Sequence, residues 1–511
     1  MQLNLSKKII VSFSIIIILL LIGSRKSAFH LDEMLTFGLA NRTYQGSLSP
    51  DIHSDSIYSG EKLWEEYTSA EHRFDYKNLW VNQAADVHPP LYYIFIHTFS
   101  SFFPGMSILW IGLLVNVFFA LVVFWQMVWL FDHFLEHTKI SIVFALLFIF
   151  TMGFINNVIF FRMYVLLTVW TNALIILFSY YRPSCAKNRA FYFALFGIML
   201  GGVLTQYYFI IFSCFACLLY AVYILKYRDY KCFLYSIVTI IASIIAASII
   251  FPALWKQIFS GYRGKEAFEN VAANGFWRNL KVYFEIIDLQ VFGQLFIFLL
   301  IVFCVIYIVS MSDKITMQIS DVGKEYQRLF IQALLPALGY LFIVIKISPY
   351  QTDRYAMNIM GILYLCCFSA FCHLAYKFSE CSIKGVIGLA ILSLMCGYKQ
   401  GIPYMYKEDA DNQLKIEQYS DNLCLYVYDS RYTYLILRNY AEMIPLQDII
   451  FIDNNSLEEL TKFYNVDSII VYVMDGVDPN DVFEKLSTNN SDKRISQQLF
   501  HFGSATAYYV R

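Results

Sequence analysis

Charged residues are scarce in this sequence: they make up 15% of the chain, whereas hydrophobic residues make up 58%. A soluble domain carries about 25% charged residues, so the composition excludes an ordinary soluble protein. The net charge of −1 gives no electrostatic reason to expect nucleic acid as a partner. Aromatic residues reach 18%, which is typical of a protein with many membrane interfaces. We therefore expect an all-α polytopic membrane protein.

We expect neither a disulfide framework nor a cleavable leader in this protein. Most of the 11 cysteines lie in apolar runs; Cys214 and Cys217 have C-x-x-C spacing, but small apolar packing explains them better than redox chemistry. The first apolar run, Ile9 to Gly23, is followed by Arg25 and Lys26 in place of a small-residue cleavage site. We expect this run to remain as the first membrane span.

About eleven apolar segments approach the length that a helix needs to cross a bilayer. They are residues 9–23, 105–131, 140–158, 163–181, 190–205, 207–225, 232–254, 291–311, 329–347, 355–376 and 383–399. The segment Leu91–Phe103 is apolar but short. It is either a re-entrant or interfacial helix or an extension of the second span.

Lysine and arginine indicate the orientation of the spans. If the N-terminus is cytoplasmic, the short loops that carry most of the lysines and arginines fall on the cytoplasmic side. The outer turns near 159–162, 206 and 348–354 then hold only Arg162 and Arg354, as the rule that positive residues stay inside requires. Only the outer loop 255–290 breaks this rule. It is either an anion-binding loop or an amphipathic helix on anionic headgroups. We expect a plasma-membrane protein with a cytoplasmic N-terminus and an extracytoplasmic C-terminal region.

After residue 400 the pattern changes to short strands and helices. Strands are predicted at 423–428, 448–453 and 467–474, helices at 431–442, 457–464 and 481–486, and a hairpin at 497–511 turning at Gly503. The sequence thus predicts a transmembrane domain over 1–400, whose first outer loop is 24–104, and a small C-terminal α/β domain over 401–511. The latter lacks a glycine-rich phosphate loop and metal-ligand spacing, so we expect it to be non-catalytic.

The first outer loop opens with two adjacent acids, Asp32 and Glu33. A carboxylate at a membrane face can take the proton of an acceptor hydroxyl, which is the role we predict for Asp32. Glu33 would orient a partner, hold a local Arg or Lys, or help to coordinate a cation. The alternative is an acidic pair that only stabilises a helix N-terminus.

The same loop closes with Asp86-Val-His88-Pro-Pro-Leu-Tyr92. Two prolines hold the backbone extended and delay the next helix until Leu91. One interpretation is a rigid hairpin that presents Asp86 and His88 to a substrate cavity, with Tyr92 at the interface. The other is a structural break before an interfacial helix.

Several further polar residues lie at predicted outer turns. The candidates for substrate binding are Arg162, Tyr164, Tyr207, Tyr208, Arg263, Lys265, Arg354 and Tyr355. A guanidinium can hold a lipid phosphate through two hydrogen bonds, and a tyrosine can stack on a sugar. The alternatives are arginines that reach to the headgroups and an ordinary aromatic belt.

The motifs in this order resemble the integral-membrane glycosyltransferases of the GT-C fold, over roughly residues 25–360. The nearest branch comprises bacterial relatives of the dolichyl-phosphate-mannose–protein mannosyltransferases and of the aminoarabinose lipid A transferase. The resemblance rests on the acidic pair, the His-Pro-Pro-Leu-Tyr block at 88–92, Arg162-x-Tyr164, the Tyr207-Tyr208 turn and Arg354-Tyr355. Phe160-Phe161 stands where the family often has Glu-Ala, and no proline closely follows Arg354.

The resemblance implies an inverting sugar transfer from a polyprenyl-phosphate-linked donor to a glycan, lipid or protein acceptor at the outer membrane face. Asp32 would be the base, and Arg162 and Arg354 would bind the leaving lipid phosphate. Apart from the donor lipid no cofactor is implied, and a divalent cation is possible without being required. The main alternative function is a transporter or flippase of lipid-linked saccharide. A polymerase or ligase of surface polysaccharide is a third interpretation. A non-enzymatic membrane anchor for the outer domain is the weakest alternative.

Overall fold

A computed structural model describes residues 4–43, 50–53, 56–70, 72–179, 188–272, 275–312, 321–376, 380–487 and 496–511. The chain forms two compact units, each of which is described by itself. The membrane unit comprises residues 1–22, 83–92 and 113–402, and the sheet unit comprises residues 23–82, 93–112 and 403–511. The division at residue 400 that the sequence suggested stays a prediction.

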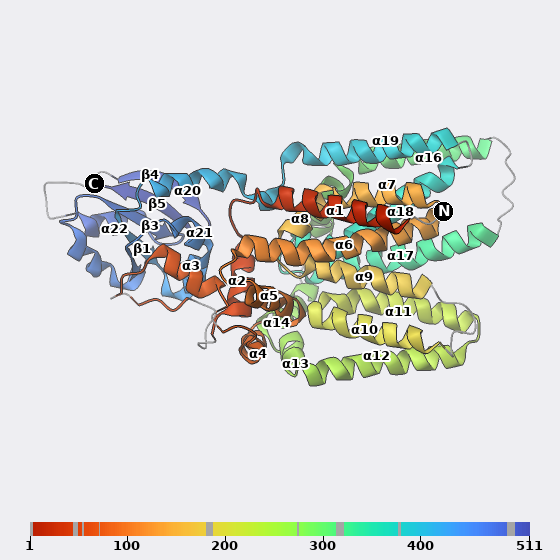
Figure 1. Ribbon diagram of the computed structural model, residues 1–511, viewed down its shortest axis with the longest axis horizontal. Helices are drawn as coiled ribbons and strands as arrows, with labels where there is room; N and C mark the ends of the chain where they lie inside the picture. The colour runs from red at the N-terminus through yellow and green to blue at the C-terminus, as the bar shows by residue number, and fades with distance from the viewer. Residues whose placement is uncertain are drawn as a thin grey trace. The chain divides into compact units, whose positions relative to one another are not determined.

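The membrane unit is a bundle of roughly parallel helices (Figure 1). Its helices are α1 (Leu5–Gly23), α6 (Ile108–Leu135), α7 (Thr138–Ile149), α8 (Met152–Ile159), α9 (Tyr164–Ser179), α10 (Arg189–Thr205), α11 (Tyr208–Lys226), α12 (Tyr230–Ile250), α13 (Ala253–Phe259), α14 (Tyr262–Ala272), α15 (Phe276–Ile287), η2 (Asp288–Phe292), α16 (Phe296–Ser312), α17 (Asp321–Ile347), η3 (Asp353–Tyr355), α18 (Met357–Ala375), α19 (Glu380–Gly397) and η4 (Tyr398–Gln400). Here η2 is a π-helix and η3 and η4 are 3-10 helices.

In the described part of the chain, seven helices are long and apolar enough to cross a membrane, or up to nine if each of two bent pairs is one span. The shorter apolar helices α9 and α10 account for the remaining predicted segments. The polytopic helical fold is therefore confirmed.

Two predicted spans are bent rather than straight. The segment predicted at 140–158 turns by 61° between α7 and α8, and the helices around 291–311 turn by 73° before α16. At the first bend Thr151 caps α8 by accepting a hydrogen bond from the Phe154 N–H, so a new helix begins there. At the second bend Gly293 and Gln294 both have left-handed backbone angles, with φ of 64° and 63°, which ends the preceding helix.

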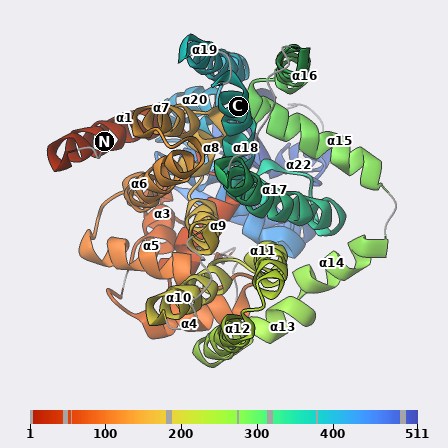
Figure 2. The same cartoon turned by 90° about the vertical axis from the view of Figure 1, so that its right-hand side faces the viewer.

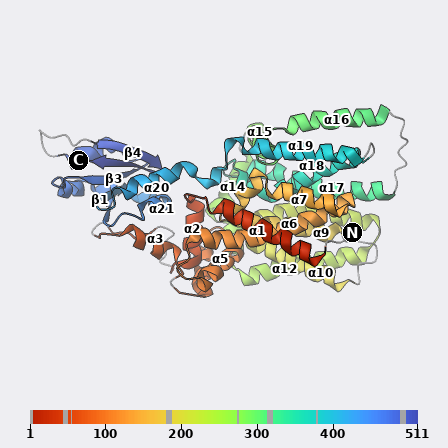
Figure 3. The ribbon, with the colours of Figure 1, turned by 45° about the horizontal axis from the view of Figure 1, so that its top comes forward.

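The core of the bundle is α18, around which the other helices are arranged (Figure 2). Within its apolar window 78% of the residues are buried, whereas the corresponding value is 17% for α12 and 11% for α1. Figure 3 likewise shows α16 at the edge of the bundle. The peripheral helices expose apolar side chains, as expected of surfaces that face lipid.

The sheet unit contains a five-stranded sheet with the strand order β2-β1-β3-β5-β4. The strands are β1 (Leu423–Tyr428), β2 (Ile449–Asp453), β3 (Ile469–Met474), β4 (Ser496–Phe502) and β5 (Ala505–Val510). β1 pairs in parallel with β2 and β3, and β5 is antiparallel to both β3 and β4. The predicted α/β character and the hairpin that turns at Gly503 are confirmed.

The connections of the sheet differ in part from the prediction. The 3-10 helices η7 (Ser430–Asn439) and η8 (Asn454–Phe463) stand where α-helices were expected, and only the short α-helix α21 (Tyr440–Met443) follows η7. The remaining helices of this part are η5 (Pro403–Met405), η6 (Lys407–Asp409), α20 (Ala410–Glu417) and α22 (Pro479–Leu486). Both η7 and η8 follow a strand-end aspartate, Asp429 or Asp453, that accepts a hydrogen bond from the second residue after it. Each is also kinked, at Tyr432 and Ser456. These local turns favour a tighter helix.

Apart from residues 83–92, the first loop belongs to the sheet unit, where it contains α2 (Leu31–Asn41), α3 (Gly60–Thr68), most of α4 (Tyr76–Ala85) and most of α5 (Leu91–Phe102). Tyr58 exchanges two backbone hydrogen bonds of 2.8 Å with Ile449 of β2, and the N–H of Gly60 bonds to Leu446. The loop is thereby fixed to the edge of the sheet. The segment Leu91–Phe103, left open by the sequence, forms a separate helix that ends before Gly105, whose φ is 80°.

Candidate active site

In the membrane unit, Asp86, His88 and Arg162 form one hydrogen-bonded chain. The Asp86 carboxylate lies 2.9 Å from Nδ1 of His88, and a terminal nitrogen of Arg162 lies 3.1 Å from Nε2 of the same ring. Because a guanidinium only donates, Nε2 must accept, and the ring proton is assigned to Nδ1, where it donates to Asp86. His88 is thus a neutral link between an anion and a cation.

Burial and charge act in opposite directions on Asp86, whose side chain is 10% exposed. Burial alone would raise the pKa of Asp86, but His88 and Arg162 more than offset it, so this pKa lies below its ordinary value. Asp86 therefore stays ionised at neutral pH and supplies the charge that balances Arg162.

The backbone before Arg162 is held by Asn116 of α6. The Asn116 amide donates to the carbonyls of Val158 and Phe160 at 2.8 and 3.0 Å, and its oxygen accepts from the Tyr92 hydroxyl at 2.9 Å. Asn116 and Tyr92 are both fully buried. Tyr92, a predicted substrate-binding residue, thus supports the turn that positions Arg162, which is itself only 3% exposed.

A second set of hydrogen bonds ties the α10–α11 turn to the Asp86 segment. The Tyr207 hydroxyl donates to the side-chain oxygen of Gln257 at 2.5 Å, and the Gln257 amide donates to the carbonyls of Gln83 and Asp86. Burial and the nearby Asp86 carboxylate raise the pKa of Tyr207, so its phenol remains a donor. Gln257 was missed by sequence reasoning, because an isolated glutamine in a basic loop carries no signal.

Other predicted tyrosines gather in the same unit. The rings of Tyr208 and Tyr355 lie 5.1 Å apart, and the phenols of Tyr164, Tyr283 and Tyr340 are close enough to Tyr208 to interact electrostatically. Tyr340 also donates to the carbonyl of Tyr355 at 2.7 Å. The structure therefore brings the Tyr164, Tyr208 and Tyr355 motifs, distant in sequence, into one cluster.

Arg263 and Arg354 share an aromatic neighbour, the half-exposed ring of Tyr350. Their guanidinium carbons lie 5.4 and 6.0 Å from its centroid. Arg263 also forms an ion pair with Glu266 at 2.7 Å. Lys265, by contrast, is exposed on α14. The Tyr350 ring thus brings two guanidinium groups close together, and a guanidinium can donate hydrogen bonds to an anion.

The acidic pair of the first loop lies in the sheet unit, at the start of α2. Glu33 is fully buried, forms an ion pair with Lys26 at 3.1 Å and accepts a hydrogen bond from the His30 N–H at 2.7 Å. The Asp32 side chain is 23% exposed. Its N–H donates to Nδ1 of His30 at 3.0 Å. The two acids thus have different surroundings: Glu33 holds a local lysine, and Asp32 retains access to solvent.

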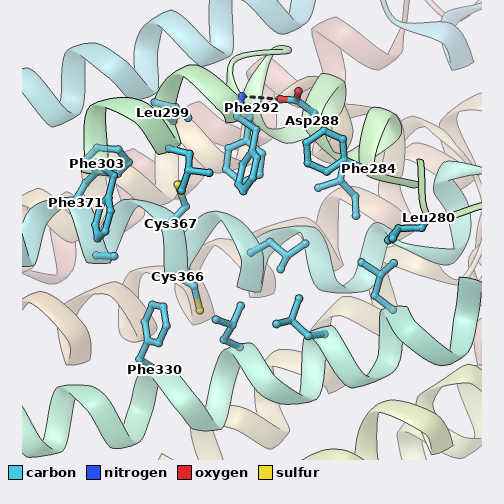
Figure 4. Close-up of a pocket in the computed structure, with 18 residues that line it drawn as sticks. Leu280, Phe284, Asp288, Phe292, Leu299, Phe303, Phe330, Cys366, Cys367 and Phe371 are labelled. Atoms are coloured by element: carbon cyan, nitrogen blue, oxygen red, sulfur yellow. Dashed lines mark hydrogen bonds between the residues drawn. The ribbon is translucent and has the colours of Figure 1, made fainter. Parts of the chain in front are cut away.

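An apolar cavity of about 530 Å³ lies in the membrane unit between α15, η2, α16, α17 and α18 (Figure 4). Its one charged lining residue, Asp288, accepts a hydrogen bond of 2.8 Å from the Phe296 N–H and so caps α16. The wall formed by η2 is linked to the Arg354 segment, because Gln290 donates to the Asp353 carboxylate at 2.7 Å. Such a lining suits a hydrocarbon chain.

Within the described ranges, no group of three or more His, Cys, Asp or Glu side chains is arranged to hold a metal ion. The divalent cation considered from the sequence stays a prediction.

The arrangement of the spans with a C-terminal α/β domain is the GT-C fold, as the sequence resemblance predicted. Among solved structures, the chain is similar to ArnT from Cupriavidus metallidurans. The crystal structure of ArnT bound to undecaprenyl phosphate matches with a TM-score of 0.54 and 10% sequence identity, covering 99% of this chain and 98% of that one. The apo structure matches with a TM-score of 0.52 at the same identity and coverage. No protein-family model and no curated protein sequence matches.

Proposed function

We propose that this protein is a membrane glycosyltransferase that moves a sugar from a polyprenyl-phosphate donor to a hydroxyl of a cell-envelope glycan, lipid or protein. One observation carries the proposal: Arg162 is held through His88 by the largely buried carboxylate of Asp86, in a chain that has the fold of ArnT. One of the two ArnT structures is bound to undecaprenyl phosphate, which supports a lipid phosphate as ligand.

The guanidinium groups of Arg162 and Arg354 suit a leaving lipid phosphate. When the bond between the anomeric carbon and the phosphate oxygen breaks, negative charge grows on the phosphate. Cations that are already in place stabilise this charge more strongly in the transition state than in the ground state. The apolar cavity beside the Arg354 segment suits the prenyl chain of the donor.

Asp32 is the general base in this proposal. Its carboxylate takes the proton of the acceptor hydroxyl while the acceptor oxygen bonds to the anomeric carbon from the side opposite the phosphate. The configuration at that carbon is inverted, and the polyprenyl phosphate leaves with the electron pair. The partial exposure of Asp32 supports this role, whereas Glu33 is fully engaged by Lys26 and the His30 N–H.

The reaction would take place at the outer face of the plasma membrane, with the N-terminus in the cytoplasm. This orientation follows from the alternation of lysine and arginine in the loops. Attaching an impermeant label to a cysteine introduced at exposed Lys462 of the C-terminal domain tests it, because only an extracytoplasmic residue reacts in intact cells.

The decisive experiment compares sugar transfer in membranes that contain the wild type, Asp32→Asn or the control Asp51→Asn. Asp51 is an exposed acid of the same loop. We expect Asp32→Asn to abolish the product and to let the lipid-linked sugar accumulate, because the amide cannot accept the proton, while Asp51→Asn retains transfer. Unchanged transfer by Asp32→Asn would contradict the role of Asp32. Movement of labelled lipid-linked sugar across the membrane without transfer would instead support a flippase.

A further inference from the structure

A buried lysine lies beside the acidic pair. Lys26 and Glu33 both have completely buried side chains, and their charged groups are 3.1 Å apart. The Lys26 ammonium also donates to the carbonyl of Tyr404 at 2.8 Å and faces the ring of Tyr406 at 4.8 Å. A buried cation is tolerated only with such partners. Lys26 therefore joins the start of the first loop to the first residues of the C-terminal domain.

From Lys26 a continuous set of contacts leads to Asp32. The Glu33 oxygen that faces Lys26 also accepts the His30 N–H at 2.7 Å, and Nδ1 of His30 accepts the Asp32 N–H at 3.0 Å. This is a capping box, which fixes the backbone at a helix start. The first turn of α2 is thus held by Glu33, and Glu33 is held by Lys26.

We infer that Lys26 is a positioning residue for Asp32, and that through Glu33 it fixes the base relative to residues 404–406. This inference rests on the proposed function, because it presumes that Asp32 is the base. It assigns to the Lys26–Glu33 pair a role in catalysis beyond holding the sheet unit together. A purely structural pair would affect the amount of folded protein but not the pH at which transfer is lost.

The charges of the pair provide a readout that separates the two roles. Removing the Lys26 cation leaves the Glu33 anion beside Asp32, which favours protonation of Asp32. The fall of kcat/KM on the acid side of its pH profile, called the acid limb below, then moves to higher pH. Removing the Glu33 charge leaves the cation and moves the limb to lower pH. The other titratable or charged groups on or packed against α2 stay the same in every variant: His30, Glu61, Lys62, Glu65, Glu66, Arg431 and Arg438.

The test measures kcat, KM for the lipid-linked donor and the pH profile of kcat/KM for the full-length protein in membranes. The variants are Lys26→Met, Glu33→Gln, the double variant and Lys26→Arg. The matched control is Lys462→Met, which breaks the exposed pair between Lys462 and Glu459 in the same unit. An exposed pair of this kind contributes little, so this control should behave as the wild type.

We expect Lys26→Met to lower kcat about tenfold or more, because displacing a reacting group slightly is costly, and to leave KM within about twofold. The acid limb should shift in opposite directions in the two single variants and return close to the wild-type position in the double variant. Lys26→Arg should keep the limb of the wild type. If Lys26→Met does not accumulate, the double variant still decides through its kcat, because it leaves neither a buried anion nor a buried cation unpaired.

The inference is overturned if every variant keeps the wild-type kcat and acid limb, or if only the amount of protein changes. This result is distinguishable from a failure of the proposed function, which would appear as sugar transfer by Asp32→Asn. Loss of transfer in Asp32→Asn together with unchanged kinetics in the Lys26 and Glu33 variants would remove only the positioning role.

Discussion

Arg162 donates a hydrogen bond of 3.1 Å to Nε2 of His88, although 74 positions separate the two residues along the chain. The contact fixes one end of a guanidinium that is almost completely buried. It also requires that the imidazole keep its accepting nitrogen, so His88 must be neutral for the contact to form. The position of the Arg162 guanidinium is therefore linked to the protonation state of His88.

Arg162 should not be replaceable by lysine. Lys is a point charge without the planar fork of arginine, so it cannot hold His88 and a phosphate in one fixed geometry. We expect Arg162→Lys to reduce kcat/KM for sugar transfer by about 10- to 1,000-fold, in line with the loss of one stabilising donor. Arg189→Lys, an exposed change at the start of α10, serves as the control. Equal activity of both variants would contradict a phosphate-binding role for Arg162.

Asp86 should make stability depend on pH. Its folded-state pKa is depressed below the ordinary value of 3.8, so the unfolded chain binds the proton more readily. The stabilisation is present above that ordinary value and is lost as pH falls through the lower, folded-state pKa. We expect thermal unfolding in detergent to show a smaller loss of stability on acidification to about pH 3 for Asp86→Asn than for the wild type. Asp51→Asn, at an exposed position, should retain the wild-type slope.

Asn116 should be important for stability as well as for the site. Asn116→Leu leaves the Tyr92 hydroxyl and the carbonyls of Val158 and Phe160 without this partner in a buried region. Each such group costs about 1–3 kcal/mol, so we expect a large decrease in the midpoint of unfolding. Asn270→Leu is the comparison, because its two hydrogen bonds are long, at 3.5 and 3.4 Å, and half-exposed. A similar midpoint for both variants would show that the Asn116 contacts are not critical.

Gly60 should tolerate no side chain. A Cβ atom at this position would lie 1.8 Å from the carbonyl oxygen of Met443, a backbone atom that cannot move away without displacing α21. We expect Gly60→Ala to lower the free energy of unfolding by about 1–3 kcal/mol or more, as overpacking does. Gly197→Ala on α10 meets no atom within 4 Å and provides the control. Urea titration monitored by tryptophan fluorescence would compare them.

Much of the fold followed from the sequence because hydrophobic length and strand alternation are local properties. The eleven apolar segments, the three parallel strands and the Gly503 hairpin were predicted at nearly their observed positions. The bends after α7 and before α16 were not predicted. Each depends on one or two residues, Thr151 in one case and Gly293 with Gln294 in the other, inside an otherwise uniform apolar run.

The candidate site followed only in part, for a different reason. The sequence indicated His88 and Arg162 as separate motifs, but their contact joins side chains that are 74 positions apart along the chain, which no local pattern contains. Asn116 and Gln257 were missed because single polar residues in apolar or basic surroundings have no distinctive spacing, and Lys26 was expected only as an unspecified local Arg or Lys beside Glu33. Their importance comes from burial, which becomes visible only in three dimensions.

The paired backbone bonds between Tyr58 and Ile449 cover part of the outer side of β2, the strand at one edge of the sheet. An uncovered edge strand offers its main-chain groups to strands of other molecules, which is a common origin of aggregation. The first loop thus shields the sheet from other copies of the chain. Substitutions that loosen this loop would therefore be recognised first as aggregation of the protein, before any defect in chemistry could be measured.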